Sequence, residues 1–188
     1  MKFPSEKESL EILKNLRVML KVVEHSKSVM IIALSIAKDI IESGHNVDVK
    51  MLKSAALLHD VGKCKYNKET GNEYMHSYES GRIMRKAGFD EFAEVVESHF
   101  GITEHESRCL GFPEPHDMMP KTIEAKILFV ADKIRPGRET LDEVVEYSRN
   151  TDKLTERYFS MCDGMKERYV ETDIKIWKEL QNMGWKHD

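Results

Sequence analysis

The sequence predicts an all-α fold, a single-domain helical bundle that spans residues 1–188. Three observations support this class. Apolar residues recur at steps of three and four in nearly every segment, residues that can cap a helix stand before these segments, and no segment shows the period-two alternation of a β-strand. Because 40% of the residues are hydrophobic and 33% are charged, the chain suits one globular domain with a packed core.

The first half of the chain divides into three predicted helices. A capping-box pattern at Ser5 starts the first helix. The second helix ends at Gly44 and carries a stripe with one polar member: Val18, Val22, His25, Val29, Ile32, Ile36 and Ile40. Asp48 caps the third helix, which runs to His59, and a polar loop over 62–73 follows.

The second half continues with helices and one long connection. Its expected elements are a helix from about His76 to Gly88, a helix from Asp90 to His99, a loop over 101–120, a helix from Thr122 to Asp132, and two or more C-terminal helices within about 140–184. The loop contains two glycines and three prolines. A loop of this length in a compact domain usually indicates function or mobility.

Composition excludes several classes of protein. A net charge of −4 gives no support for dedicated nucleic-acid binding, and no apolar run is long enough to cross a bilayer. The N-terminus lacks the apolar core of a signal peptide. The three cysteines, Cys64, Cys109 and Cys162, form no CxxC pair and argue against a zinc ribbon or a disulfide framework. These features predict a cytoplasmic protein without membrane association.

Four polar residues stand on the apolar stripes of four different helices. They are His25, His59, His99 and Asp132, and Asp60 adjoins one of them. A lone core histidine is usually structural, but four such residues indicate metal ligands gathered from facing helices. Imidazole and carboxylate donors suit Mn, Fe, Zn, Co or Ni better than an all-oxygen calcium site. We therefore predict one or two divalent transition metals, with Mg²⁺ as a further option.

The same residues carry a family resemblance. His25, then His59-Asp60, then Asp132 resembles the H…HD…D signature of the HD-domain metal-dependent phosphohydrolase superfamily. The run from His59 to Lys63 is similar to the HDIG variant of that signature, with Val in place of Ile. The resemblance covers about 20–140, on which the C-terminal helices of 140–184 would pack. It implies an HD-type helical fold that hydrolyses a phosphate ester or anhydride.

The resemblance also implies a ligand set for two metals. His25, His59, Asp60 and Asp132 would hold one metal, whereas His76 and His99, with Asp60 as a bridge, would hold the other. The stretch 126–138 is similar to the ADxIxPGR segment of the bacterial symmetrical dinucleoside tetraphosphatases. The 101–120 loop is longer than expected there and looks more like a functionally unassigned HDIG branch, which leaves the substrate open.

This ligand set permits in-line hydrolysis by a metal-bound hydroxide. Asp60 would orient the hydroxide, so Asp60 and Lys63 are the predicted catalytic residues. Lys63, Arg135 and Arg138 are the predicted substrate-binding residues, because their cations match phosphate oxygens. Two histidines of the long loop, His105 and His116, could also approach a substrate.

We expect the substrate to be a phosphorylated small molecule, most simply a nucleotide. Two other functions use the same ligands: a di-iron oxygenase of the HD fold and a non-catalytic nucleotide-sensing module. A purely structural module would leave the buried ligands unexplained. The sequence leaves the oligomeric state open, a homodimer included.

Overall fold

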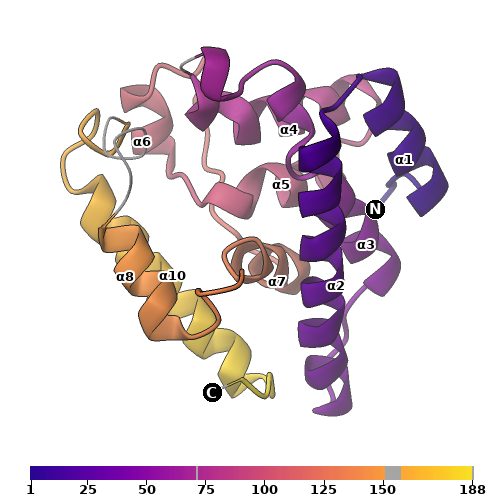
Figure 1. Ribbon diagram of the computed structural model, residues 1–188, viewed down its shortest axis with the longest axis vertical. Coiled ribbons are helices and arrows are strands. Elements are labelled where there is room, and N and C mark those ends of the chain that lie inside the picture. The colour runs from indigo at the N-terminus through magenta and orange to yellow at the C-terminus, as the bar shows by residue number, and fades with distance from the viewer. Residues whose placement is uncertain (71, 151–157, 188) are drawn as a thin grey trace.

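The computed structural model describes residues 1–70, 72–150 and 158–187, and this part of the chain is built from helices (Figure 1). Outside the helices, the described residues form only two isolated backbone bridges, Ile102–Met118 and Arg135–Arg138. The all-α prediction is therefore confirmed. None of the described helices has the length and apolar character needed to cross a membrane.

The N-terminal helices form one side of the molecule. Their bounds are α1 Glu6–Asn15, α2 Leu20–Glu42 and α3 Val49–Leu58. Ser5 accepts a hydrogen bond from the Glu8 amide and the Glu8 carboxylate accepts one from the Ser5 amide, so the predicted capping box is present. Asp48 caps α3 by accepting from the Met51 amide. The long helix α2 contacts both α3 and α7.

The middle of the chain is more helical than predicted. Its elements are η1 Val61–Cys64, η2 Lys68–Thr70, η3 Glu73–Met75, α4 His76–Lys86, α5 Asp90–Glu97, η4 Ser98–Phe100 and α6 Glu104–Cys109. The predicted loop over 62–73 contains the short 3-10 helices η1 and η2, and its Gly71 lies outside the described residues. The predicted loop over 101–120 contains α6. Thr103 and Glu106 form a capping box there, a signal that the sequence carries and that the prediction overlooked.

The C-terminal elements are α7 Ile123–Ala131, α8 Leu141–Arg149 and α10 Met165–Asn182, while 151–157 lies outside the described residues. Helix α7 is viewed nearly end-on in Figure 1, between α2 and the pair formed by α8 and α10. It contacts α2, α3, α5 and α10, and five consecutive residues from Ile127 to Ala131 are buried. A helix that is apolar on all sides must be enclosed by others, which explains its central place.

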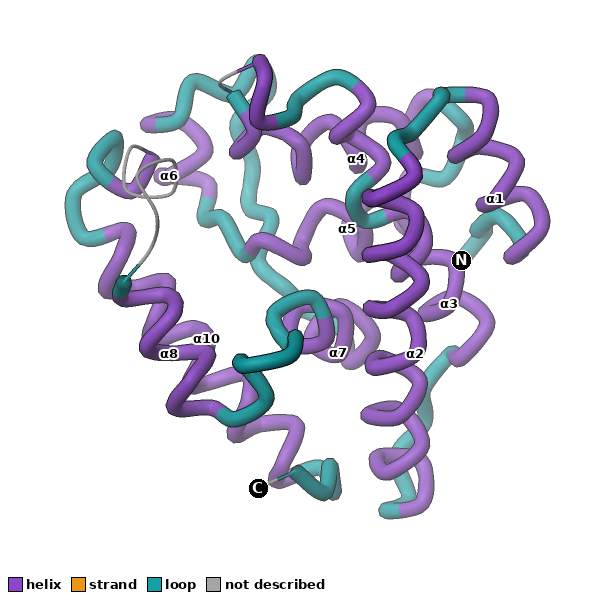
Figure 2. The backbone as a smooth tube through the Cα atoms, viewed as in Figure 1, coloured by secondary structure: helices purple, strands orange, loops and turns teal. Residues whose placement is uncertain are grey.

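Two apolar clusters fill the interior. The larger one joins α2, α3, α5, α7 and α10. The smaller one joins α6 and its flanking loops to the start of α10: Tyr78, Ile102, Leu110, Phe112, Met118, Tyr158, Phe159, Cys162, Met165 and Tyr169. Loops, teal in Figure 2, connect the helices on the upper side where α4, α5 and α6 lie.

Candidate metal centre

The structure brings together all six predicted metal ligands, most of them at helix ends. His25 lies on α2, His59 is the C-cap of α3 and Asp60 follows it. His76 begins α4, His99 lies in η4 and Asp132 is the C-cap of α7: the structure places side chains from five separate elements at one point. The polar residues on the apolar stripes therefore converge as the sequence predicted.

One group of three ligands consists of His25, His59 and Asp132, whose donor atoms all lie within 4.8 Å of one another. Asp132 Oδ1 lies 2.9 Å from His25 Nε2 and 3.3 Å from His59 Nε2. His59 is fully buried, whereas His25 and Asp132 are partly exposed. This group has the donors of a transition-metal site with one side open.

The second group consists of Asp60, His76 and His99, again with donor atoms within 4.8 Å of one another. Asp60 Oδ1 lies 3.1 Å from His76 Nε2 and 3.8 Å from His99 Nε2. All three residues are buried. The two groups share a border, since the rings of His59 and His99 meet edge to face with centroids 4.9 Å apart.

Asp60 lies between the two groups and presents one oxygen to each. Its Oδ1 faces His76 and His99, while its Oδ2 lies 3.6 Å from His25 Nε2 and 3.5 Å from His59 Nε2. A carboxylate with this orientation can bridge two cations. The geometry therefore agrees with the bridging place that the family resemblance gave to Asp60.

Backbone carbonyls fix the orientation of three of the imidazoles. Nδ1 of His59 donates to the Ala56 carbonyl at 2.8 Å, and Nδ1 of His99 donates to the Val96 carbonyl at 2.7 Å. His76 Nδ1 donates in the same way to the carbonyl of Glu73. In its neutral form, each ring therefore carries its proton on Nδ1 and turns the lone pair of Nε2 inward. Backbone carbonyls that accept from Nδ1 orient metal-binding histidines in this manner.

The inward lone pairs fit a metal better than they fit one another. Nε2 of His59 is buried without a hydrogen-bond partner. Nε2 of His76 lies 3.0 Å from Nε2 of His99, and when both rings are neutral neither atom carries a hydrogen. Burial lowers the pKa of His99 to about 3, so this ring is neutral at pH 7. An unpartnered ring nitrogen and two facing lone pairs are the features that a bound divalent cation would satisfy.

Both carboxylates are held in the charged form. Although burial opposes ionisation, the Lys63 ammonium holds the pKa of Asp60 well below its usual range. A hydrogen bond with His25 does the same for the pKa of Asp132, again against the effect of burial. The centre therefore offers two anionic ligands at neutral pH, as a cation requires.

The predicted cationic residues lie at different distances from this centre. Lys63 Nζ donates to Asp60 Oδ2 at 2.6 Å. The Arg135 guanidinium is exposed and has one nitrogen 3.5 Å from His25 Nε2. Arg138 lies over the ring of Tyr147, 3.8 Å from its centroid, and pairs with Arg135 through the backbone. Lys63 and Arg135 thus lie directly beside the predicted ligands, whereas Arg138 contacts Arg135.

The two loop histidines that could approach a substrate have other partners. His116 Nε2 lies 2.9 Å from Glu97 Oε1. His105 lies beside Cys109, with Nε2 3.7 Å from Sγ. The prediction also missed Lys133, the neighbour of Asp132, which is buried with Nζ 3.0 Å from the Tyr169 hydroxyl. A lysine after a predicted helix end carries no sequence signal for such burial.

Three curated relatives illustrate the different kinds of protein that this chain resembles. An uncharacterized protein of Methanocaldococcus jannaschii is 38% identical over 143 residues, which cover 73% of this chain and 80% of the relative. A tRNA (cytidine(56)-2'-O)-methyltransferase of Thermoplasma volcanium is 32% identical over 78% of this chain, but only 41% of its own length is covered. Ribonuclease Y of Treponema denticola is 35% identical over 85% of this chain and 27% of its own length. The chain therefore spans less than half of the last two relatives.

A solved structure and a family model complete the comparison. The HD domain of the Listeria monocytogenes phosphodiesterase PgpH matches with a TM-score of 0.50 and 16% identity, covering 92% of this chain and 98% of that one. This likeness shows a shared fold. The family model described as HD domain matches residues 22–137, a stretch that begins before His25 and ends after Asp132. The predicted family is confirmed, and the chain belongs to the HD domain family.

Proposed function

We propose that the chain is a metal-dependent phosphohydrolase that acts on a nucleotide-like phosphate ester or anhydride. One observation carries the proposal. Asp60 presents one oxygen to each of two ligand groups, and the ammonium of Lys63 lies 2.6 Å from that carboxylate. Such an arrangement suits a pair of metals beside a cation, which is a combination that stabilises the charge of a phosphate in transfer.

The ligands would hold one or two divalent metals from the set Fe, Mn, Zn, Co and Ni, with Mg²⁺ as a further option. Bound divalent metals would supply Lewis acidity and an activated water at neutral pH. His59, His76 and His99 hold their lone pairs inward through the carbonyl bonds described above. Asp60 would orient the attacking water, because it lies between both groups.

The cationic side chains next to the two ligand groups would bind the substrate. Lys63 is partly exposed, so its ammonium can face an incoming phosphate while it keeps its bond to Asp60. The exposed guanidinium of Arg135 can contact a second phosphate oxygen through its forked donors. Arg138, stacked on Tyr147, would support Arg135 or contact a more distant phosphate.

A phosphodiester is the bond that we favour within this class. Ribonuclease Y of Treponema denticola, 35% identical over most of this chain, has a name that denotes cleavage of RNA, whose links are phosphodiesters. A small nucleotide or a short oligonucleotide is the simplest form in which to offer such a bond. Cyclic nucleotides, dinucleoside polyphosphates and short RNA are therefore the compounds to test first.

The test is an anaerobic assay of metal-loaded protein against this panel, with products separated by chromatography. We expect hydrolysis without oxygen, loss of turnover in Asp60→Ala, and a fall in kcat of about 10²- to 10³-fold in Lys63→Gln. Lys65→Gln is the matched control, since this exposed lysine lies two residues away and outside the centre. We expect its activity to equal that of the wild type.

Each outcome of the assay decides a specific point. Full activity in a folded Asp60→Ala variant would contradict the catalytic role of Asp60. Turnover that requires oxygen would contradict hydrolysis and favour a di-iron oxygenase. Tight nucleotide binding without turnover for any of the metals would favour a sensing module. Circular dichroism of each variant separates loss of activity from loss of helicity.

A further inference from the structure

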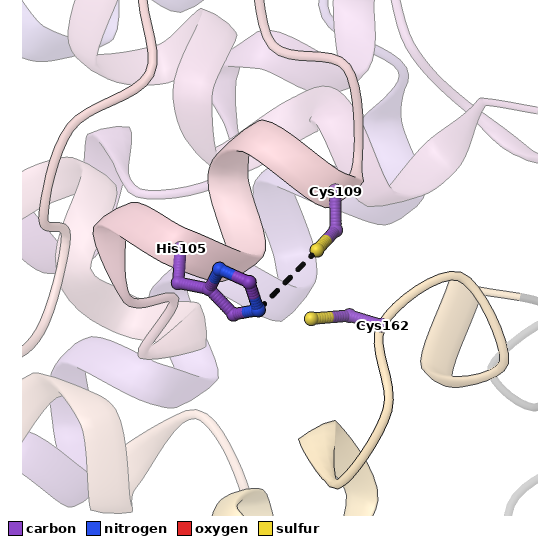
Figure 3. Close-up of side chains that lie close together, drawn as sticks. All are labelled: His105, Cys109 and Cys162. Carbon is purple, nitrogen blue, oxygen red and sulfur yellow. Dashed lines mark hydrogen bonds between the residues drawn. The ribbon is translucent and has the colours of Figure 1, made fainter.

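A second group of metal-binding side chains lies outside the HD centre. His105 and Cys109 stand one turn apart on α6, and Cys162 comes from the segment before α10. Their donor atoms all lie within 4.8 Å of one another, and His105 Nε2 is 3.7 Å from Cys109 Sγ. Figure 3 shows the three side chains pointing toward a common space between the two segments.

This donor set has the chemistry of a zinc site. Two sulfurs and one imidazole are the soft and borderline ligands that Zn²⁺ prefers. Zn–S bonds of about 2.3 Å and Zn–N bonds of about 2.0–2.1 Å place tetrahedral donors roughly 3.6 Å apart. The measured separation of Nε2 and Sγ, 3.7 Å, agrees with such a geometry.

The surroundings hold the donors in place. Cys162 is buried in the smaller apolar cluster, against which Cys109 packs. Arg168 of α10 donates two hydrogen bonds to the Glu106 carboxylate on α6, at 2.7 and 2.6 Å. This bidentate pair fixes α6 against α10 within the same turn that carries His105 and Cys109. The packing of α6 against α10 therefore supports the site.

The exposure of the three ligands differs in a way that leaves one position open. Cys162 is buried, Cys109 is half-buried and His105 is exposed, so the group opens toward solvent on the side of His105. Burial and a hydrogen bond with Cys109 raise the pKa of the Cys162 thiol to about 11. Without a cation this sulfur is a protonated thiol at pH 7, a poor nucleophile for disulfide exchange.

We propose that His105, Cys109 and Cys162 bind a Zn²⁺ ion, with water as the fourth ligand, at a site separate from the HD centre. Both thiols would release their protons to solvent as the Zn–S bonds form. The ion would join α6 to the segment before α10 and so stabilise the packing of the smaller apolar cluster. The proposal is independent of the reaction at the HD centre.

Cobalt provides the test, because it reports the ligand type. Titration of reduced, metal-free protein with Co²⁺ should produce a sulfur-to-cobalt charge-transfer band in the near ultraviolet and intense visible bands of tetrahedral coordination. The six predicted ligands of the HD centre contain only nitrogen and oxygen donors, so cobalt bound there gives no sulfur band. Zn²⁺ added afterwards should remove the band.

Variants assign the band to its ligands. We expect Cys109→Ser and Cys162→Ser to lose it, and His105→Ala to require more Co²⁺ for the same intensity. Cys64→Ser is the matched control, since this exposed thiol lies elsewhere, and Asp60→Ala tests independence from the HD centre. Both should keep the full band. Because Cys162 is buried, Cys109→Ser decides the matter if Cys162→Ser fails to fold.

Two results would overturn the proposal. One is a sulfur band that persists in Cys109→Ser with native helicity. The other is reduced wild-type protein without any sulfur band at saturating Co²⁺. Mass spectrometry after thiol alkylation confirms that Cys109 and Cys162 stay reduced during the titration.

Discussion

Gly62 shows how one residue can position two predicted metal ligands, Asp60 before it and His76 after it. A Cβ atom placed on Gly62 would lie 2.1 Å from the His76 carbonyl oxygen and 2.8 Å from the Ser80 amide nitrogen. The Gly62 amide also donates to Ser80 Oγ at 2.8 Å. This close approach brings η1 against α4, and therefore brings Asp60 beside His76. The glycine of the motif is needed for contact between backbones.

We expect Gly62→Ala to lower the bound metal per protein and the activity far more than the helicity. The nearest atoms are backbone atoms of α4, so η1 and α4 must separate, at a cost of about 1–3 kcal/mol in unfolding free energy. Metal analysis and urea denaturation measure the two effects. Ser80→Ala is the control, because it removes the hydrogen bond without a collision and should keep its metal. Native metal content in Gly62→Ala would contradict this account.

At the residue scale, the sequence predicted which side chains gather at the candidate metal centre, but it did not predict their hydrogen-bond partners. His25 and Asp132 were found because each interrupts an apolar stripe on a predicted helix. Only the family resemblance suggested the bridging place of Asp60; residue spacing does not give the two-sided orientation of its carboxylate, since that depends on how α3, α4 and α7 pack. Cys109 and Cys162 are 53 positions apart and form no local motif, so only the folded chain brings them together.

At the scale of elements, the predicted helices are present and the predicted long loops are partly wrong. Helix α6 has only six residues, too few for a stripe with repeated spacing, so periodicity missed it. Its capping box and the bridge from Ile102 to Met118 give the 101–120 segment a fixed course. One consequence is that His116 reaches Glu97 at the end of α5, where Arg85 of α4 also binds.

This contact predicts a pH dependence of stability. Glu97 raises the pKa of His116 above its ordinary 6.5. Because the pKa is higher in the folded state, the stabilisation is fully present below pH 6.5 and is lost as the pH rises through the folded-state pKa. Glu97 stays charged over this window, since Arg85 and His116 lower its pKa despite burial.

We expect His116→Gln to unfold more easily than the wild type below pH 6.5, with the difference in unfolding free energy shrinking at higher pH. Urea denaturation at a series of pH values, with both proteins in the same metal state, measures this difference. His45→Gln is a suitable control, because that exposed histidine lies in a turn away from Glu97. A difference that is constant with pH would show that His116 acts through packing alone.

At the scale of the whole molecule, a buried polar network joins the candidate metal centre to the C-terminal helices. Lys133 directly follows the ligand Asp132, and its Nζ lies 3.2 Å from Asp173 Oδ1 and 3.0 Å from the Tyr169 hydroxyl, both on α10. Ser148 of α8 donates to the other oxygen of Asp173 at 2.7 Å. The Lys133 ammonium also lies over the ring of Phe129, 3.4 Å from its centroid. The end of α7, which carries Asp132, is thereby fixed to α8 and α10.

Loss of Asp173 alone should lower the free energy of unfolding more than loss of Asp173 and Lys133 together. Burial lowers the pKa of Lys133, so its charge depends on Asp173. We expect Asp173→Asn to lose about 3–5 kcal/mol of unfolding free energy, because it leaves a buried ammonium without its counter-charge. The double variant Lys133→Met with Asp173→Asn should recover much of that loss, and a double-mutant cycle in urea measures the coupling. Additive effects of the two substitutions on the unfolding free energy would contradict a coupled pair. An unchanged metal affinity in Asp173→Asn would show that the network supports the fold without positioning Asp132.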